Sequence, residues 1–119
     1  MAQHNELGKL GEELAVDFLK NNGYTILETN WTFQKAEIDI IAQINDTLAI
    51  IEVKTRSTIE FGLPQEAVTA KKIKLLTKAI DNYVVEKDLD FNVRFDIISI
   101  HKEAKSFVIE HLTDAFYHF

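Results

Sequence analysis

Three charged residues stand in two segments that otherwise have the composition of buried strands. Asp39 lies in AEIDIIAQI, residues 36–44, and Glu52 and Lys54 lie in TLAIIEVKTR, residues 47–56. Charged side chains are seldom placed in such strands without a partner. Two carboxylates and an ammonium could form a salt-bridged part of a sheet. They could also hold a metal ion beside a cationic group, an arrangement suited to hydrolysing phosphodiesters.

A hairpin would set the spacing of these residues. A tight turn at residues 45–46 would join the two strands, so that the numbers of facing residues sum to 91. This register makes one face wholly apolar, pairing Ile38 with Val53, Ile40 with Ile51 and Ala42 with Ala49. The other face would place Asp39 opposite Glu52, and Glu37 opposite Lys54.

Asp39 and Glu52 would then be like charges with Cβ atoms about 4.5–5.5 Å apart, which destabilises a sheet. Two carboxylates at the edge of apolar surroundings share a proton or bind a cation. Oxygen ligands without cysteine favour a hard ion, so we expect Asp39 and Glu52 to bind Mg²⁺ or Mn²⁺. Lys54 could orient an attacking water or stabilise charge on a phosphoryl group. The alternative is a salt-bridged strand in which Glu37 pairs with Lys54.

Positive charge is concentrated directly after these residues. Residues 54–78 contain six basic and two acidic side chains, although the formal net charge of the whole chain is −6. Lys71, Lys74 and Lys78 follow i, i+3, i+7 spacing and would form one stripe on a helix, where a solvated face is the alternative. The candidate contacts to nucleic acid are Arg56, Gln65, Lys71, Lys72, Lys74 and Lys78.

Periodicity gives the element order α-β-β-β-α-β-β. The predicted helices cover residues 6–22 and the segment from Pro64 to about residue 85, and the predicted strands cover 24–33, 36–44, 47–56, 92–100 and 106–112. Asn5 is the predicted N-cap of the first helix and Gly23 its C′ residue. We interpret the chain as a single domain over residues 1–119, an α/β or α+β mixed sheet in which the second helix is the crossover.

Glu12 lies at the margin of the apolar stripe of the first helix. Gly8 and Gly11 on neighbouring turns would let this helix approach the sheet closely. The spacing leaves both a site role and an ordinary surface position open for Glu12.

Other polar and aromatic residues favour structural roles. Arg94 and Asp96 alternate with apolar residues, which predicts a buried ion pair. The histidines show no metal-ligand spacing and are predicted to lie at the surface: His4, His101, His111 and His118. The tail residues Phe116, Tyr117 and Phe119 are predicted to cover the core, with a homodimer contact as the alternative.

Composition excludes several classes of protein. The chain has 119 residues, of which 46% are hydrophobic and 27% charged, as in ordinary globular domains. Without cysteine it can have neither disulfides nor thiolate metal sites, which fits a reducing cytosol. No apolar run approaches the roughly 18 residues needed to span a bilayer, and the first residues do not have the pattern of a signal peptide. We therefore expect a cytoplasmic protein without a membrane segment.

Several short motifs together resemble one family. The D-x(12)-E-x-K pattern of Asp39, Glu52 and Lys54 resembles that of the PD-(D/E)xK nuclease superfamily. The wider pattern adds G-x-x-G-E-x-x-A at 8–15, EIDIIA at 37–42, EVKTR at 52–56, FG at 61–62, AV at 67–68 and RFDI at 94–97. It is similar to the YraN-like family of uncharacterised bacterial proteins, predicted nucleases that are similar to archaeal Holliday junction resolvases. Ala36 departs from the glycine common in this family before EID.

The resemblance implies a restriction-endonuclease-like fold and Mg²⁺-dependent cleavage of DNA, with branched or structured DNA as one expected substrate. By position, Asp39 and Glu52 would bind the metal, Lys54 would assist the nucleophile, and Glu12 would add an acidic group from the first helix. Resolvase-like relatives that cut symmetric junctions act as dimers, which makes a homodimer one expectation. One alternative is a nucleic-acid-binding protein, or a DNA uptake or repair adaptor, that keeps the fold but does not cut. Another is an interaction module whose charges form only an ion-pair network.

Overall fold

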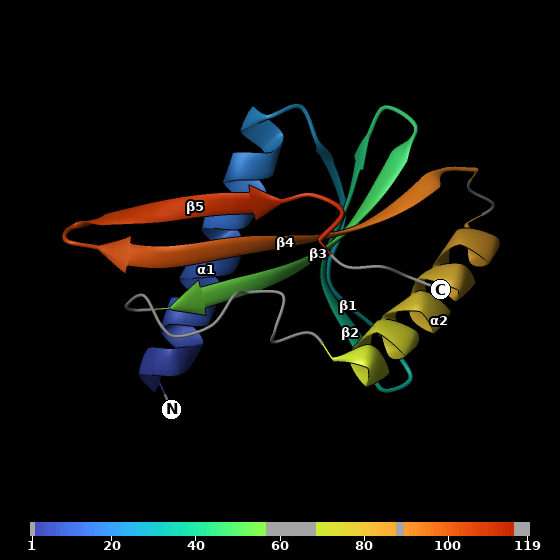
Figure 1. Ribbon diagram of the computed structural model, residues 1–119, viewed down its shortest axis with the longest axis horizontal. Helices are drawn as coiled ribbons and strands as arrows, with labels where there is room; N and C mark the ends of the chain where they lie inside the picture. The colour runs from blue at the N-terminus through green and yellow to red at the C-terminus, as the bar shows by residue number, and fades with distance from the viewer. Residues whose placement is uncertain (1, 57–68, 88–89, 116–119) are drawn as a thin grey trace.

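The chain forms one mixed five-stranded sheet with a helix on each face (Figure 1). The computed structural model describes residues 2–56, 69–87 and 90–115, and the side chains from residue 6 onward. The elements are α1 (Ala2–Asn21), β1 (Thr25–Phe33), β2 (Ala36–Ile44), β3 (Thr47–Arg56), α2 (Ala70–Glu86), β4 (Asn92–Glu103) and β5 (Ser106–Leu112). This order confirms the predicted α-β-β-β-α-β-β sequence and an α+β sheet consistent with the restriction-endonuclease-like fold.

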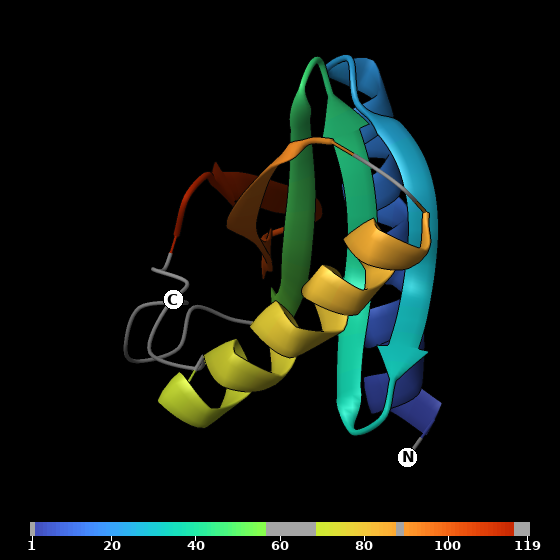
Figure 2. The same cartoon turned by 90° about the vertical axis from the view of Figure 1, so that its right-hand side faces the viewer.

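The sheet follows the chain, in the order β1-β2-β3-β4-β5. Neighbouring strands are antiparallel except β3 and β4, which are parallel. A parallel pair needs a crossover, and the connection that contains α2 supplies it, as predicted. Figure 2 shows α2 in front of the sheet and α1 behind it. Neither of the described helices is long and apolar enough to cross a bilayer.

Two predicted helix starts are wrong. α1 begins at Ala2, so Asn5 lies inside the helix rather than at its N-cap, because no proline or glycine stops the helix from extending towards the N-terminus. α2 begins at Ala70 rather than at Pro64, and Pro64 lies outside the described residues. Thr69 caps α2, since its side-chain oxygen accepts a hydrogen bond from the Lys72 backbone N–H at 3.1 Å.

The sheet is apolar on both faces at its centre, and each face packs against one helix. The cluster on the α2 face contains Ile38, Ile41, Leu48, Ile50, Leu76, Ile80, Tyr83 and Phe95. The cluster on the α1 face contains Ala15, Leu19, Ile40, Ala42, Ala49, Ile51, Ile98 and Ile100. Burial on both faces fixes the central strands β2, β3 and β4 between two helices.

A compact polar network is buried within β4 and its neighbours. Asp96 is 0% exposed, and the Arg94 guanidinium donates to both of its oxygens at 2.8 and 2.9 Å, which confirms the predicted buried ion pair. His111 Nε2 lies 2.8 Å from Asp96 Oδ2, so its prediction as a surface residue is wrong. Burial alone would raise the pKa of Asp96, but hydrogen bonds from His111, Arg94 and the Asp114 N–H hold it below its ordinary value. This network joins β4 to β5 and to the turn after it.

His101 is also not fully exposed, with a side chain that lies 3.5 Å from Glu103. The remaining predictions on histidines and on the aromatic tail fall outside the described part of the chain. They concern the side chain of His4 and residues Phe116, Tyr117, His118 and Phe119.

α1 approaches the sheet closely at Gly11. A Cβ atom added to Gly11 would lie 1.9 Å from Thr55 Oγ1 on β3, whereas one added to Gly8 would meet nothing within 4 Å. The close approach predicted for both glycines therefore applies to Gly11 alone. This contact fixes the height of α1 above β3, and with it the position of the next residue, Glu12.

We expect Gly11→Ala to destabilise the fold by about 1–3 kcal/mol, because α1 or Thr55 must move to accommodate the methyl group. The matched control is Gly8→Ala, which should stabilise the helix by up to about 1 kcal/mol. Urea unfolding of both variants measures the difference. Equal stability of the two variants would show that α1 does not depend on this contact.

Candidate active site

The site lies where β2 and β3 stop pairing. The predicted register is confirmed from the pair Ile44–Thr47 to the pair Ile40–Ile51, where the backbone pairing ends. Beyond that point, Asp39 Oδ2 accepts a hydrogen bond from the Val53 backbone N–H at 2.8 Å. The carboxylate thus takes the place of a backbone acceptor, and the predicted direct pairing of Asp39 with Glu52 is wrong because the two strands separate one residue earlier.

The alternation of β2 also changes at Asp39. Ile38 belongs to the cluster on the α2 face, and Ile40 belongs to the cluster on the α1 face. In a regular strand these two residues would share a face, as predicted for them. On β1, Asn30 lies between the partners of these residues and has a positive φ of 50°. Both strands are therefore irregular here, and Asp39 stands between the two faces of the sheet.

Asp39 lines a cavity on each side. The cavity on the α2 side has a volume of about 480 Å³ and is lined by Lys35, Ala36, Glu37, Asp39, Glu52, Thr69, Lys71, Lys72, Leu75 and Leu76. The other, beside α1, has a volume of about 490 Å³ and is lined by Lys9, Glu12, Glu13, Val16, Asp17, Thr29, Asn30, Asp39 and Ile40. The candidate carboxylates Asp39 and Glu52 thus meet in the first cavity, and Glu12 meets Asp39 in the second.

Glu52 is a buried carboxylate neutralised by two lysines. It is 8% exposed, and its Oε1 atom lies 2.5 Å from Lys72 Nζ and 3.4 Å from Lys54 Nζ. Lys54 therefore pairs with Glu52 on its own strand and not with Glu37, the partner predicted for it. The reason is again the separation of the strands, which removes Glu37 from the position opposite Lys54.

Asp39 is less well compensated. The pKa of its carboxyl is raised to about 6, because burial and the negative charges of Glu52 and Glu12, which raise it, outweigh the Val53 N–H and Lys72, which lower it. A carboxylate in this state is stabilised by any additional cation that reaches it. Such an environment is typical of functional sites.

The donor atoms present fit a hard cation. Within the described residues, no hydrogen bond or ion pair engages Asp39 Oδ1 or Glu52 Oε2, so each carboxylate keeps one oxygen for a ligand. Carboxylate oxygens are the ligands that Mg²⁺ and Mn²⁺ prefer. Glu12 does not complete a group of three, because no three acidic or histidine side chains converge in the described part of the chain; its Oε2 accepts a hydrogen bond from Asn30 at 3.1 Å.

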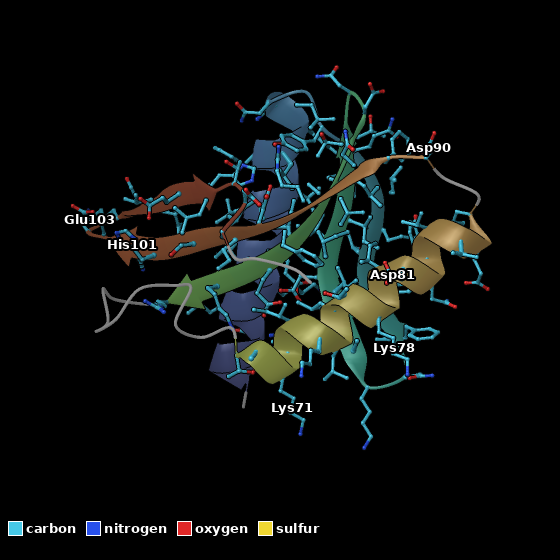
Figure 3. All side chains as sticks on the ribbon, turned by 45° about the vertical axis from the view of Figure 1, so that its right-hand side comes forward. Lys71, Lys78, Asp81, Asp90, His101 and Glu103 are labelled. Atoms are coloured by element: carbon cyan, nitrogen blue, oxygen red, sulfur yellow. The ribbon has the colours of Figure 1, made fainter. Side chains whose placement is uncertain are left out.

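The predicted nucleic-acid contacts lie in different places. Lys71, Lys74 and Lys78 are exposed on α2, and Figure 3 shows Lys71 extending clear of the ribbon at the start of this helix. Lys72 instead turns inward to Glu52. Arg56 is half-buried at the end of β3, and Gln65 lies outside the described residues.

Comparison with known proteins identifies the family. The model of the uncharacterised protein family UPF0102 matches residues 11–100. A UPF0102 protein of Flavobacterium psychrophilum is 64% identical over 119 residues, covering 100% of both chains. Another from Flavobacterium johnsoniae is 57% identical, again over 100% of both, and one from Bacteroides fragilis is 48% identical over 98% of this chain and 97% of its own. The chain belongs to the UPF0102 family. The names of these relatives state the family and no activity.

For Lys72 of this UPF0102 protein, the sequence pattern did not predict the contact with Glu52. Charge clustering groups it with phosphate contacts on a solvated helix face. However, the buried residues of α2 are Leu76, Ala79, Ile80 and Tyr83, and Lys72 precedes Leu76 by one helical turn. Its position on the apolar stripe is the signal that could have predicted this contact. A lysine on that stripe points toward the sheet, so its ammonium must reach either a buried anion or solvent.

We expect Asp39→Asn to stabilise the metal-free UPF0102 protein at neutral pH. The folded pKa of about 6 lies above the ordinary value of 3.8, so the folded state binds more protons in this range and stability falls as pH rises from 3.8 to 6. Asparagine keeps an oxygen for the Val53 N–H but carries no charge, which removes a cost of up to about 3 kcal/mol above pH 6.

Urea unfolding in EDTA at pH 4.5 and 7.5 measures this effect. The matched control is Glu37→Gln, which changes an exposed carboxylate on the same strand and should alter stability by less than about 0.5 kcal/mol. An Asp39→Asn variant no more stable than the wild type at pH 7.5 would contradict the raised pKa.

Proposed function

We propose that this protein is a metal-dependent DNA endonuclease that hydrolyses phosphodiester bonds, with branched or structured DNA as its expected substrate. One observation carries the proposal: Asp39 and Glu52, each with an open oxygen, meet in one cavity beside two lysine ammonium groups. The fold and the membership in UPF0102 are compatible with this activity.

Asp39 and Glu52 would hold Mg²⁺ or Mn²⁺ through Oδ1 and Oε2. When bound, the ion would supply an activated water and stabilise charge on the phosphoryl group. The Val53 N–H holds the Asp39 carboxylate in a fixed orientation through Oδ2. Lys54 lies on the same face of β3 as Glu52 and would orient the nucleophile or contact a phosphate oxygen.

The exposed lysines of α2 would place the DNA over this cavity. Lys71 lines the cavity, and Lys74 and Lys78 continue from it along the outer side of the helix. These three ammonium groups would contact phosphates without reading bases. Arg56 and Gln65 are further proposed contacts. A homodimer would present two such sites to the two strands of a junction.

A second function is favoured by the same ion pairs. Because Lys54 and Lys72 together neutralise Glu52, this carboxylate needs no metal, and the site could serve binding alone. The protein would then be a nucleic-acid-binding protein or a DNA uptake or repair adaptor that keeps the nuclease fold. The two functions differ in whether DNA is cut.

Cleavage of branched, single-stranded and duplex DNA in Mg²⁺ or Mn²⁺ tests the activity. The wild type should cut at least one of these substrates. Asp39→Asn and Glu52→Gln should each reduce the rate more than about 100-fold, because the ion provides several kcal/mol of transition-state stabilisation. Equal rates in all three proteins would identify a contaminating nuclease and refute the assignment.

The double variant Lys71→Glu with Lys74→Glu should weaken DNA binding. It should also lower the slope of log affinity against log salt by about 1 for each phosphate that the protein no longer neutralises. Lys102→Glu with Lys105→Glu is the charge-matched control, placed at the β4–β5 hairpin, whose tip Figure 3 marks with His101 and Glu103. Fluorescence anisotropy in Ca²⁺ or EDTA measures affinity without cleavage. An equal decrease in affinity for the two double variants would mean that α2 is not the binding surface.

A further inference from the structure

Lys72 makes the shorter of the two ion pairs at the candidate site. Its ammonium lies 2.5 Å from Glu52 Oε1, against 3.4 Å for Lys54, and it crosses from α2 to the sheet to do so. The backbone of Lys72 is fixed independently, because its N–H donates to the capping oxygen of Thr69. The side chain can therefore change partner while the helix stays in place.

The position that Lys72 occupies is one in which a cation is required. Glu52 is buried, and its charge also acts on Asp39, whose pKa is raised partly for that reason. Removing the partner of a buried carboxylate leaves an uncompensated charge. In the metal-free protein the Lys72 ammonium neutralises Glu52, and Lys72 lines the same cavity as Asp39.

A divalent ion held by Asp39 and Glu52 would also neutralise the Glu52 carboxylate. The ion and the ammonium would then lie within a few ångströms of each other in a partly buried cavity, where like charges repel strongly. Lys54 is held beside Glu52 by its own strand, whereas Lys72 has an open cavity next to it and solvent beyond, since its side chain is 35% exposed. Lys72 is therefore the cation free to leave.

We propose that Lys72 is an exchangeable occupant of the cation position: its ammonium neutralises Glu52 in the metal-free protein and leaves Glu52 when the divalent ion binds. This inference rests on the proposed function, in which Asp39 and Glu52 bind that ion. The released ammonium would lie at the cavity wall beside Lys71, so binding of the ion would add a positive charge to the surface that receives the phosphate.

A merely structural ion pair makes a different prediction. In both cases, loss of the Lys72 charge destabilises the metal-free protein, because Glu52 loses its nearer partner. Removal of the Lys72 charge should strengthen metal binding in both cases, because an ammonium beside Glu52 repels a divalent ion whether or not it moves. Only an exchanging ammonium leaves Glu52 when the ion binds, so the environment of the Lys72 side chain with and without the metal separates the two roles.

The test compares Mn²⁺ binding by the wild type, Lys72→Met, Lys72→Arg and Asp39→Asn, using calorimetry and the Mn²⁺-dependent rise in melting temperature. Lys72→Met should lower the melting temperature without metal and tighten Mn²⁺ binding about tenfold or more. Lys72→Arg keeps the charge and should bind like the wild type. Unchanged or weaker Mn²⁺ binding by Lys72→Met would overturn the exchange.

Failure of the proposed function gives a different result. If neither the wild type nor Lys72→Met shows Mn²⁺ binding that Asp39→Asn abolishes, the metal site itself is refuted, and the exchange with it. Lys72→Gln, which keeps a donor for Glu52, replaces Lys72→Met if that variant does not fold.

In the wild type, Mg²⁺ should shift the NMR signal of the Lys72 side chain and leave that of exposed Lys78 unchanged; an unshifted Lys72 signal in Mg²⁺-bound protein also overturns the exchange.

Discussion

The site depends on one hydrogen bond, from the Val53 backbone N–H to the Asp39 carboxylate. It forms where the ladder between β2 and β3 ends, and it satisfies a backbone donor that the ladder no longer pairs. Because a side chain rather than a backbone carbonyl accepts this bond, β2 can separate from β3 without leaving the Val53 N–H unsatisfied. The separation opens the cavity that Asp39 and Glu52 share.

A fully buried and a half-buried carboxylate of this protein, Asp96 and Asp39, lie in opposite electrostatic environments. Asp96 is surrounded by Arg94, His111 and the Asp114 N–H, and its pKa is held below the ordinary value. Asp39 receives one backbone hydrogen bond and lies near two other carboxylates, and its pKa is raised to about 6. The first arrangement stabilises the sheet by itself. The second leaves a charge that a further cation would stabilise, which distinguishes a candidate site from a structural network.

Packing of the two helices on the sheet positions the rest of the site. On one face, the contact of Gly11 with Thr55 holds α1 close to β3 and brings Glu12 to the cavity beside Asp39. On the other face, the Thr69 cap fixes the first turn of α2, from which Lys72 reaches Glu52. The site thus combines side chains from β2, β3 and α2, with α1 approaching from behind, and a small change in either helix would alter its charge balance.

The sequence by itself determined the elements and much of their arrangement. Alternation and turn residues predicted β2, β3 and β5 to the residue, and the apolar pairing around residues 45–46 predicted the hairpin register as far as Ile40–Ile51. These signals are local, because strand period and turn chemistry depend on neighbours in the chain. The predicted hairpin also grouped Asp39, Glu52 and Lys54, and the fold brings these three residues to one region.

Only the tertiary structure decided how these charges are paired. A register extended by periodicity placed Asp39 opposite Glu52 and Lys54 opposite Glu37, but the strands separate there and the side chains find other partners. Lys72 reaches Glu52 across 20 residues of sequence, and His111 reaches Asp96 across 15. Such contacts depend on where a crossover helix and an edge strand lie over the sheet. Periodicity within a segment carries no information about where another segment packs. The sequence therefore identifies the charged residues, and only the fold determines which of them pair.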